Sequence, residues 1–204
     1  QQLAELLGYL NGTLPRAHAF ARLSALPGAP ERPEPWLLGS SAQSSVWAAE
    51  VGLPYVFADF INPAGGVLAR RYLETFQPSA QVSHSHVIVA TWALCAETDA
   101  EAERLAASAR MAFALFLEGQ PGAIPSVEVA LEYLADRPQV LSALTQRRRW
   151  TVGSPPTVRA RLEAIASEYD ADEIMIVTMT HDHESRRRSY ELIAREFAVS
   201  TRSA

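Results

Sequence analysis

The clearest chemical signal in the sequence is a cluster of small residues at the start of a predicted helix. Gly39, Ser40, Ser41 and Ser44 follow a short apolar run and open a helix predicted over 42–51. Gly39 allows a sharp turn close to a ligand, Ser41 stands at the N-cap position, and Ser44 follows one turn later. A helix start offers free N–H groups, hydroxyls and the positive end of its dipole to one point, which favours phosphate binding. By spacing alone, simple helix capping explains these serines equally well.

A second polar cluster follows the last predicted strand and contains Thr178, Thr180, His181, Asp182 and His183. The two histidines have no evident third ligand, so they make an incomplete metal site and no metal is expected. A solvent-exposed turn in which Asp182 caps the next helix is the favoured interpretation. Lining of an active site by one of these side chains is the alternative.

Further polar residues accompany the other predicted strands. Asp59 and Asn62 follow the second strand, at the end where parallel strands carry active sites. Asp59 either shapes a pocket or, as the favoured interpretation, caps a loop. The arginine run at 147–149 reaches a phosphate, closes over the site as part of a mobile segment or, as favoured, forms a solvated face. His84 and His86 precede the third strand, which places them at its opposite, exposed end.

Strands and helices alternate along most of the chain. We predict strands over 36–38, 55–60, 87–94 and 173–179. We predict helices from the N-terminus to Gly12 and over 42–51, 62–76, 99–117, 126–148, 158–169 and 184–197. This alternation is typical of a parallel α/β sheet. The third strand is apolar on both faces, as in a sheet that helices cover.

Four strands are too few for either common α/β fold, because a doubly wound sheet has about five or six and a closed barrel has eight. Half a barrel leaves a strand edge at each side and a large apolar surface exposed. The first residues already follow a helical pattern, without an initiator methionine. We therefore expect residues 1–204 to form a single domain, the C-terminal part of a barrel. Its N-terminal strands would lie outside this sequence or come from another chain.

Composition narrows the class of protein. The net charge of −5 argues against nucleic acid as a partner, since binding to a phosphate backbone needs a basic face. No apolar run is long enough to span a membrane, and no signal peptide stands at the front. The one cysteine, Cys95, is expected to be an inert core residue and favours the reducing cytoplasm. Basic residues that are all arginine, with frequent alanine, indicate a GC-rich bacterium.

Three segments resemble the luciferase-like flavin-dependent monooxygenases, the superfamily of bacterial luciferase and alkanesulfonate monooxygenase. The first is Leu-Gly-Ser-Ser at 38–41, which continues as Trp-Ala-Ala-Glu-Val-Gly-Leu-Pro at 47–54. The second, Val-Gly-Ser-Pro-Pro-Thr-Val at 152–158, is similar to the superfamily's Gly-Thr/Ser-Pro-Glu-x-Val element, with Pro156 in place of the acidic residue. The third is the last predicted strand with the helix after it. The resemblance covers almost the whole chain in the right order.

The resemblance implies a specific fold, cofactor and activity. Members are (β/α)8 TIM barrels that bind reduced FMN and use molecular oxygen to oxygenate an aldehyde, a sulfonate or another small organic molecule. Some relatives use a reduced deazaflavin for hydride transfer instead. In the superfamily a Ser-x-x-Ser/Thr element holds the flavin phosphate, which here corresponds to Ser41 and Ser44, with Gly39 and Ser40 adjoining. Members are commonly homodimers and receive reduced flavin from a separate flavin reductase.

The resemblance also shows what this sequence lacks. The superfamily's catalytic histidine, part of its flavin-ring contact surface and further phosphate-binding arginines lie on the first barrel strands, to which no stretch of this chain corresponds. No catalytic residue is therefore predicted. We expect a flavin-dependent monooxygenase that acts on an aldehyde or a natural-product intermediate. The alternatives are a noncatalytic flavin-binding or dimer-partner subunit of the same family and a deazaflavin-dependent oxidoreductase.

Overall fold

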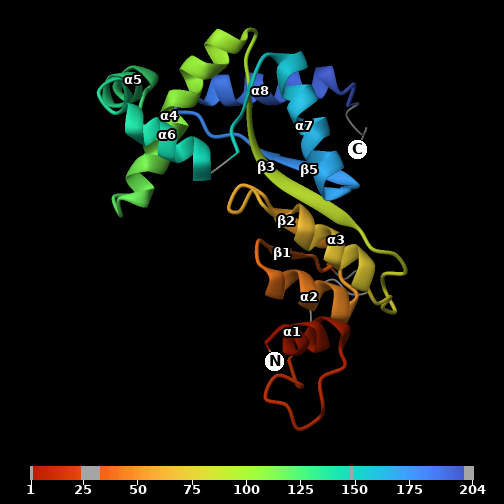
Figure 1. The fold of residues 1–204 in the computed structure, drawn as a ribbon. Coiled ribbons are helices and arrows are strands. Elements are labelled where there is room, and N and C mark those ends of the chain that lie inside the picture. The colour runs from red at the N-terminus through yellow and green to blue at the C-terminus, as the bar shows by residue number, and fades with distance from the viewer. Residues whose placement is uncertain (1, 24–32, 148, 200–204) are drawn as a thin grey trace.

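The computed structural model describes residues 2–23, 33–147 and 149–199, which contain one parallel sheet (Figure 1). The strands are β1 (Leu37–Gly39), β2 (Tyr55–Ala58), β3 (Val87–Cys95), β4 (Thr151–Gly153) and β5 (Glu173–Val177). Every strand pair is parallel, which confirms the sheet type predicted from the alternation of elements. β3 is the central strand and pairs with β2, β4 and β5. β1, β4 and β5 each have one neighbour among the described strands.

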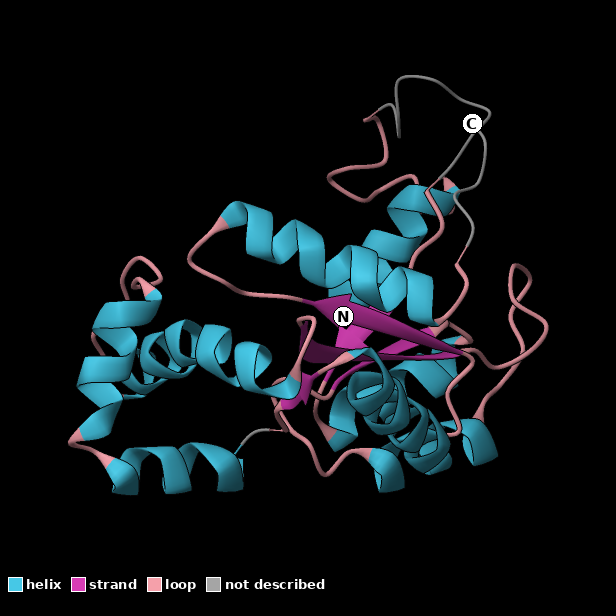
Figure 2. Cartoon of the chain, turned by 90° about the horizontal axis from the view of Figure 1, so that it is seen from above, coloured by secondary structure: helices cyan, strands magenta, loops and turns pink. Residues whose placement is uncertain are grey.

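Helices cover the sheet unequally. The described helices are α1 (Gln2–Asn11), α2 (Ala42–Val51), α3 (Gly66–Thr75), α4 (Asp99–Leu117), α5 (Val127–Ala135), α6 (Pro138–Arg147), α7 (Pro155–Tyr169) and α8 (His183–Glu196). Side chains of α2, α3, α7 and α8 pack on one face of the sheet, and α4 packs on the other face near the end of β3. α5 and α6 pack on α4, at one side of the molecule (Figures 1 and 2).

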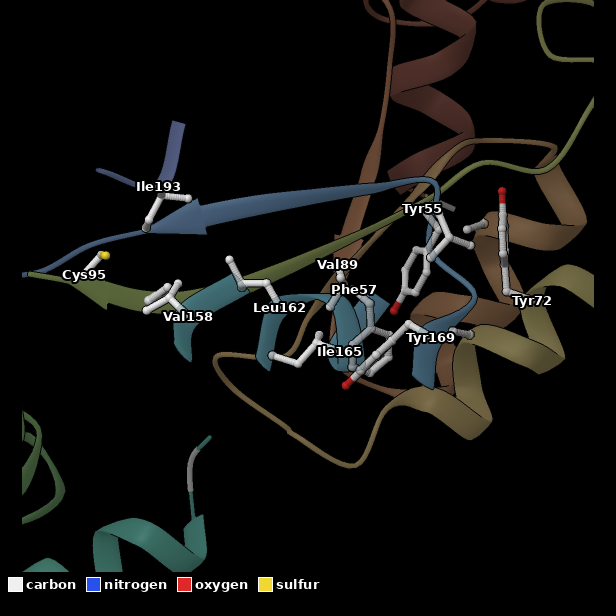
Figure 3. Packing of buried hydrophobic residues seen from close by; sticks show 14 of the residues in the cluster. Tyr55, Phe57, Tyr72, Val89, Cys95, Val158, Leu162, Ile165, Tyr169 and Ile193 are labelled. Carbon is white, nitrogen blue, oxygen red and sulfur yellow. The ribbon is translucent and has the colours of Figure 1, made fainter. Parts of the chain in front are cut away.

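The main core lies between the sheet and the four helices on its first face (Figure 3). Tyr55 and Phe57 of β2 and Val89 of β3 meet Leu162 and Ile165 of α7 there, and all five are at most 1% exposed. Full burial of one large apolar side chain contributes about 1.5–3 kcal/mol. This contact therefore fixes the helices on the sheet and, with them, the loops that join strands to helices.

The opposite face of the sheet is only partly covered. The strand register places Leu38, Met175 and Val177 on that face, and these side chains are 53%, 45% and 40% exposed. A half-barrel was expected to leave such an apolar surface and two strand edges. Closure of the sheet into a barrel stays a prediction, because the described strands form an open sheet.

Several predicted boundaries were wrong. The sheet has a fifth strand, β4, which was not predicted because three residues at 151–153 are too few to show a strand period. β2 ends at Ala58, and α3 begins at Gly66 because the intervening residues form turns that pack on α7. The helical stretch predicted at 126–148 is two helices, which break before Pro138. By contrast, the helix predicted over 42–51 ends where expected, because Gly52 follows it as a C-cap with φ 66°.

Candidate functional site

The serine cluster forms a capping box at the start of α2. Ser41 is the N-cap, and its Oγ accepts from the Ser44 backbone N–H at 3.2 Å. In return, Ser44 Oγ accepts from the Ser41 backbone N–H at 3.3 Å. The predicted capping by Ser41 is therefore confirmed. The N–H groups of Ala42 and Gln43 lie in the first turn, where no carbonyl of the same helix accepts from them.

The hydroxyl of Ser44 is held by three other oxygens. It donates to Ser41 O at 2.9 Å and lies 3.1 Å from Ser41 Oγ and 2.9 Å from the phenol of Tyr55. Tyr55 is fully buried in β2, and this burial raises the pKa of its phenol, which stays neutral. Ser41 is exposed, so its hydroxyl proton can turn outward to a ligand while Ser44 stays fixed. Tyr55 was not predicted, because its contact arises from the pairing of β1 with β2.

Gly39 leaves no room for a side chain at the end of β1. A Cβ at this position would overlap the Ser44 hydroxyl and would lie 2.6 Å from Ser44 Cβ and 3.2 Å from the Tyr55 phenol oxygen. The adjoining Ser40 offers its carbonyl to the side-chain amide of Asn62 at 3.1 Å. The loop 39–44, called the serine loop below, is therefore packed against β2 on one side and linked to the β2–α3 loop on the other.

Asp59 lies at the centre of a buried hydrogen-bond network next to this loop, and its predicted role as a loop cap was wrong. The side chain is fully buried. Its Oδ1 accepts from the phenol of Tyr169 at 3.0 Å and from Arg149 Nε at 3.2 Å, and its Oδ2 accepts from Thr91 Oγ1 at 2.9 Å. Burial, together with the Asp59 carboxylate, raises the pKa of Tyr169 far above its usual range, so the phenol keeps its proton. No sequence signal links Asp59 to Tyr169, because they lie on separate elements.

Arg149 is the positive partner of Asp59, so the solvated face predicted for the arginine run was wrong at this position. Besides its contact with Asp59, Arg149 Nη2 donates to Pro63 O at 2.9 Å and pairs with Glu168 Oε2 at 3.0 Å. Burial alone would lower the pKa of the guanidinium, but the two carboxylates outweigh it and raise that pKa. Arg148, in the middle of the run, lies outside the described residues.

The turn after β5 is mainly structural. Asp182 is the N-cap of α8 and accepts from the Ser185 N–H at 2.7 Å, which confirms the predicted cap and holds the pKa of Asp182 low. The hydroxyl of Thr178 is buried and donates to Ala93 O at 2.7 Å. His181 is exposed and lies 2.8 Å from Ile124 O through its Nδ1. These contacts place the cluster in a surface turn, as the favoured interpretation predicted.

Other predicted residues lie away from the serine loop. His86 lies at the start of β3, where its Nε2 is 2.9 Å from Glu173 Oε1, and His84 next to it is exposed, as predicted. Cys95 is buried in β3, and burial, then Glu97, raises the pKa of its thiol to about 11. In the part of the chain that the structure describes, no three His, Cys, Asp or Glu side chains gather as a metal site requires. None of the helices in these ranges is long and apolar enough to cross a membrane.

Comparison with known proteins identifies homologues of this chain. No profile of a protein family matches the chain. The uncharacterised protein YwcH of Bacillus subtilis is 40% identical over 97% of this chain and 60% of its own length. A luciferase-like monooxygenase of Escherichia coli K12 is 31% identical over 94% of this chain and 56% of its own length. This chain is a homologue of the luciferase-like monooxygenases.

Solved structures agree with this relationship, which confirms the resemblance inferred from the sequence. The crystal structure of apo-MsnO8 is 33% identical and matches with a TM-score of 0.87 over 98% of this chain and 60% of its own. The oxygenating constituent of 3,6-diketocamphane monooxygenase from Pseudomonas putida, solved with FMN, has a TM-score of 0.56 at 22% identity, over 80% of this chain and 48% of its own. At that identity the match indicates a shared fold alone. This chain spans less than two thirds of the length of these relatives.

Proposed function

We propose that this chain is the C-terminal part of a (β/α)8 barrel enzyme, a monooxygenase that uses reduced FMN and molecular oxygen. The observation that carries the proposal is the loop 39–44, in which a capping box at a helix start follows the carboxyl end of a parallel strand. Ligands of parallel α/β folds bind at this end of the strands. The homologue in Escherichia coli that is named a monooxygenase supports the choice of reaction.

The loop has the groups that a flavin phosphate needs. The backbone N–H groups of Ala42 and Gln43 lie at an exposed helix start, next to the outward hydroxyl of Ser41. The helix dipole adds about 0.3–1 kcal/mol for an anion, and each hydrogen bond to a charged acceptor about 1.5–3 kcal/mol. Close packing of Gly39 against Ser44 fixes the loop before the ligand arrives, which lowers the entropic cost of binding.

Each group of this chain then has a distinct role. The bound flavin supplies the redox chemistry with oxygen, as cofactors do in such enzymes. Ser41 and the first-turn N–H groups of α2 hold the phosphate. Ser44 and Tyr55 keep the loop in shape through their hydroxyl contact. The apolar face of the sheet that carries Leu38 and Met175 would be covered once the barrel closes.

The proposal includes partners that the superfamily resemblance implies. A flavin reductase would supply reduced FMN, and two copies of the complete protein would form a homodimer. The substrate class is a small organic molecule, an aldehyde or a natural-product intermediate, oxygenated in the cytoplasm. A reduced deazaflavin is the alternative cofactor, and a noncatalytic flavin-binding subunit is the alternative to an enzyme.

Titration with flavins tests the proposal. The full chain is titrated with oxidised FMN and, without oxygen, with reduced FMN and a reduced deazaflavin, and binding is followed by flavin fluorescence or absorbance. We expect reduced FMN to bind and the Ser41→Ala/Ser44→Ala variant to bind it at least about tenfold more weakly, because the variant loses the Ser41 hydroxyl that contacts the phosphate and the Ser44 hydroxyl that holds the loop. Ser126→Ala removes a matching helix cap on α5, away from this loop, and is expected to bind FMN like the wild type.

The outcomes separate the alternatives. Binding of the reduced deazaflavin, without binding of FMN, would show that the deazaflavin is the cofactor. Binding of FMN without oxygen consumption in the presence of a reductase and candidate aldehydes would favour the noncatalytic subunit. Equal FMN affinity in the wild type and the Ser41→Ala/Ser44→Ala variant would contradict the assignment of the phosphate to this loop.

A further inference from the structure

The buried Asp59 holds the β2–α3 loop in place. A fully buried carboxylate is costly unless it is paired and hydrogen-bonded. Here Arg149, Tyr169 and Thr91 together satisfy both of its oxygens. These partners come from the segment before β4, from the end of α7 and from β3, so Asp59 joins three separate parts of the fold.

The same partners also hold the rest of the loop. Besides binding Asp59, the phenol of Tyr169 accepts from the Gly65 N–H at 3.1 Å, and Arg149 Nη2 donates to Pro63 O at 2.9 Å. A Cβ at Gly65 would overlap the ring of Phe57, so the loop lies directly on β2. Both ends of the loop are therefore fixed by the network around Asp59.

The middle of this loop contacts the serine loop through one side chain. Asn62 Nδ2 donates to Ser40 O at 3.1 Å, while its Oδ1 accepts from the Ala64 N–H at 3.2 Å. The second bond orients the amide group, so the first bond has a defined direction. Ser40 directly precedes the N-cap Ser41, and its carbonyl fixes the orientation of the peptide plane that leads into the capping box.

We infer that Asp59 and Asn62 are positioning residues for the serine loop. The network around Asp59 fixes the β2–α3 loop, and the bond from Asn62 to Ser40 O holds the serine loop in a fixed position relative to it. This inference rests on the proposed assignment of a flavin phosphate to the loop 39–44. Neither residue touches the phosphate. Each acts by keeping the N–H groups and the Ser41 hydroxyl in the geometry that the phosphate requires.

The experiment compares FMN with riboflavin, which is the same flavin without the phosphate. Dissociation constants of the full chain are measured for both ligands, and their ratio reports the contribution of the phosphate alone. We expect Asn62→Ala to reduce the preference for FMN by about threefold to tenfold, the effect of one hydrogen bond. Its affinity for riboflavin is expected to stay unchanged, which a general loss of structure would not give. Gln81→Ala, which removes an exposed amide bonded to Asn11, is the control and should change neither constant.

A second variant tests whether Asp59 acts through Asn62. Asp59→Asn leaves Arg149 facing a neutral side chain and should also reduce the preference for FMN. In the double variant with Asn62→Ala the loss should be smaller than the sum of the two free-energy changes, because both act through one path. Additive losses would overturn the link between them. Because Asp59 is buried, thermal unfolding is measured to check that Asp59→Asn is folded. Asn62→Ala tests the contact with Ser40 without changing a buried residue.

Failure of the inference differs from failure of the proposed function. A wild-type chain that binds FMN and riboflavin equally would overturn the phosphate assignment and the inference together. A wild-type preference that Ser41→Ala/Ser44→Ala abolishes and Asn62→Ala preserves would overturn the inference alone.

Discussion

At the scale of single residues, the serine loop combines two roles that the sequence left open. The bonds between Ser41 and Ser44 are those of a helix cap, which stabilises α2 with or without a ligand. The same bonds leave the Ser41 hydroxyl and two backbone N–H groups at an exposed helix start. Helix capping and phosphate binding are thus compatible, because the cap uses Ser41 Oγ only as an acceptor and leaves its hydroxyl proton to point outward.

Gly39 gives a steric prediction at this scale. Gly39→Ala would place a methyl group on the Ser44 hydroxyl, so the loop must move and the free energy of unfolding should fall by about 1–3 kcal/mol. Urea unfolding measures this loss. Gly122→Ala is the matched control, since no atom lies within 4 Å of its added Cβ, and its midpoint should stay close to that of the wild type. A Gly39→Ala variant as stable as the wild type would show that the loop has room for a side chain.

Cys95 gives a chemical prediction. Burial, then Glu97, raises the pKa of its thiol to about 11, so only about one thiol in a thousand is ionised near pH 8. A raised pKa means that the unfolded chain loses this proton first, and stability should therefore fall as the pH rises from about 9 toward 11. The native chain should not react with a disulfide reagent near pH 8, whereas the chain unfolded in guanidinium should release one equivalent. Rapid reaction of the native chain would contradict a buried thiol.

Sequence reasoning at this scale succeeded where a residue acts on its neighbours in the chain. The caps at Ser41 and Asp182 and the helix stop at Gly52 depend on local spacing, and the structure confirms them. The predicted role of Asp59 was wrong because its partners Arg149 and Tyr169 lie about 90 and 110 residues away in the sequence. No local pattern records such contacts, since they form only when α7 packs against β2.

At the scale of elements, α4 and α7 are joined by a hydrogen bond that gives a pH prediction. The Ser154 backbone N–H lies 2.6 Å from Asp99 Oδ1, and this bond, with the nearby hydroxyls of Ser154 and Thr157, holds the pKa of Asp99 below its usual 3.8. Because folding lowers this pKa, the stabilisation is complete above the pKa of the unfolded chain and is lost as the pH falls through the lower folded value. Asp99→Asn should therefore reduce stability near pH 7.

The pH dependence of this variant is its test. The difference in urea midpoint between the wild type and Asp99→Asn should shrink as the pH falls from about 5 toward 2, because the wild-type carboxylate becomes protonated. A difference that stays constant over this range would show that the charge of Asp99 does not contribute.

Element prediction from the sequence worked for long, periodic segments and failed for short ones. β3 and α4 were predicted within one residue of their observed bounds, because a nine-residue strand that is apolar except for Thr91 and a capped helix give strong patterns. β4 was missed because its three residues become a strand only by pairing with the end of β3. Part of the segment between β2 and α3 was predicted as helix from its local pattern. It forms turns instead, because the network around Asp59 holds its backbone.

At the scale of the whole molecule, an open parallel sheet with one incompletely covered face agrees with half of a barrel. Four helices bury one face, while Leu38, Met175 and Val177 are exposed on the other. The relatives that this chain matches are longer, and the chain spans 60% of YwcH. Sequence alone predicted the sheet type and the family, but catalytic residues were not predictable, because the resemblance places them on strands to which no part of this chain corresponds.

A crystal structure of the full chain with FMN tests the phosphate site most directly. We expect phosphate oxygens within hydrogen-bonding distance of the Ser41 hydroxyl and of the N–H groups of Ala42 and Gln43. We also expect Asn62 to stay bonded to Ser40 O in the complex. An FMN phosphate bound at any other place, with the loop 39–44 free of ligand, would show that this loop does not hold the phosphate.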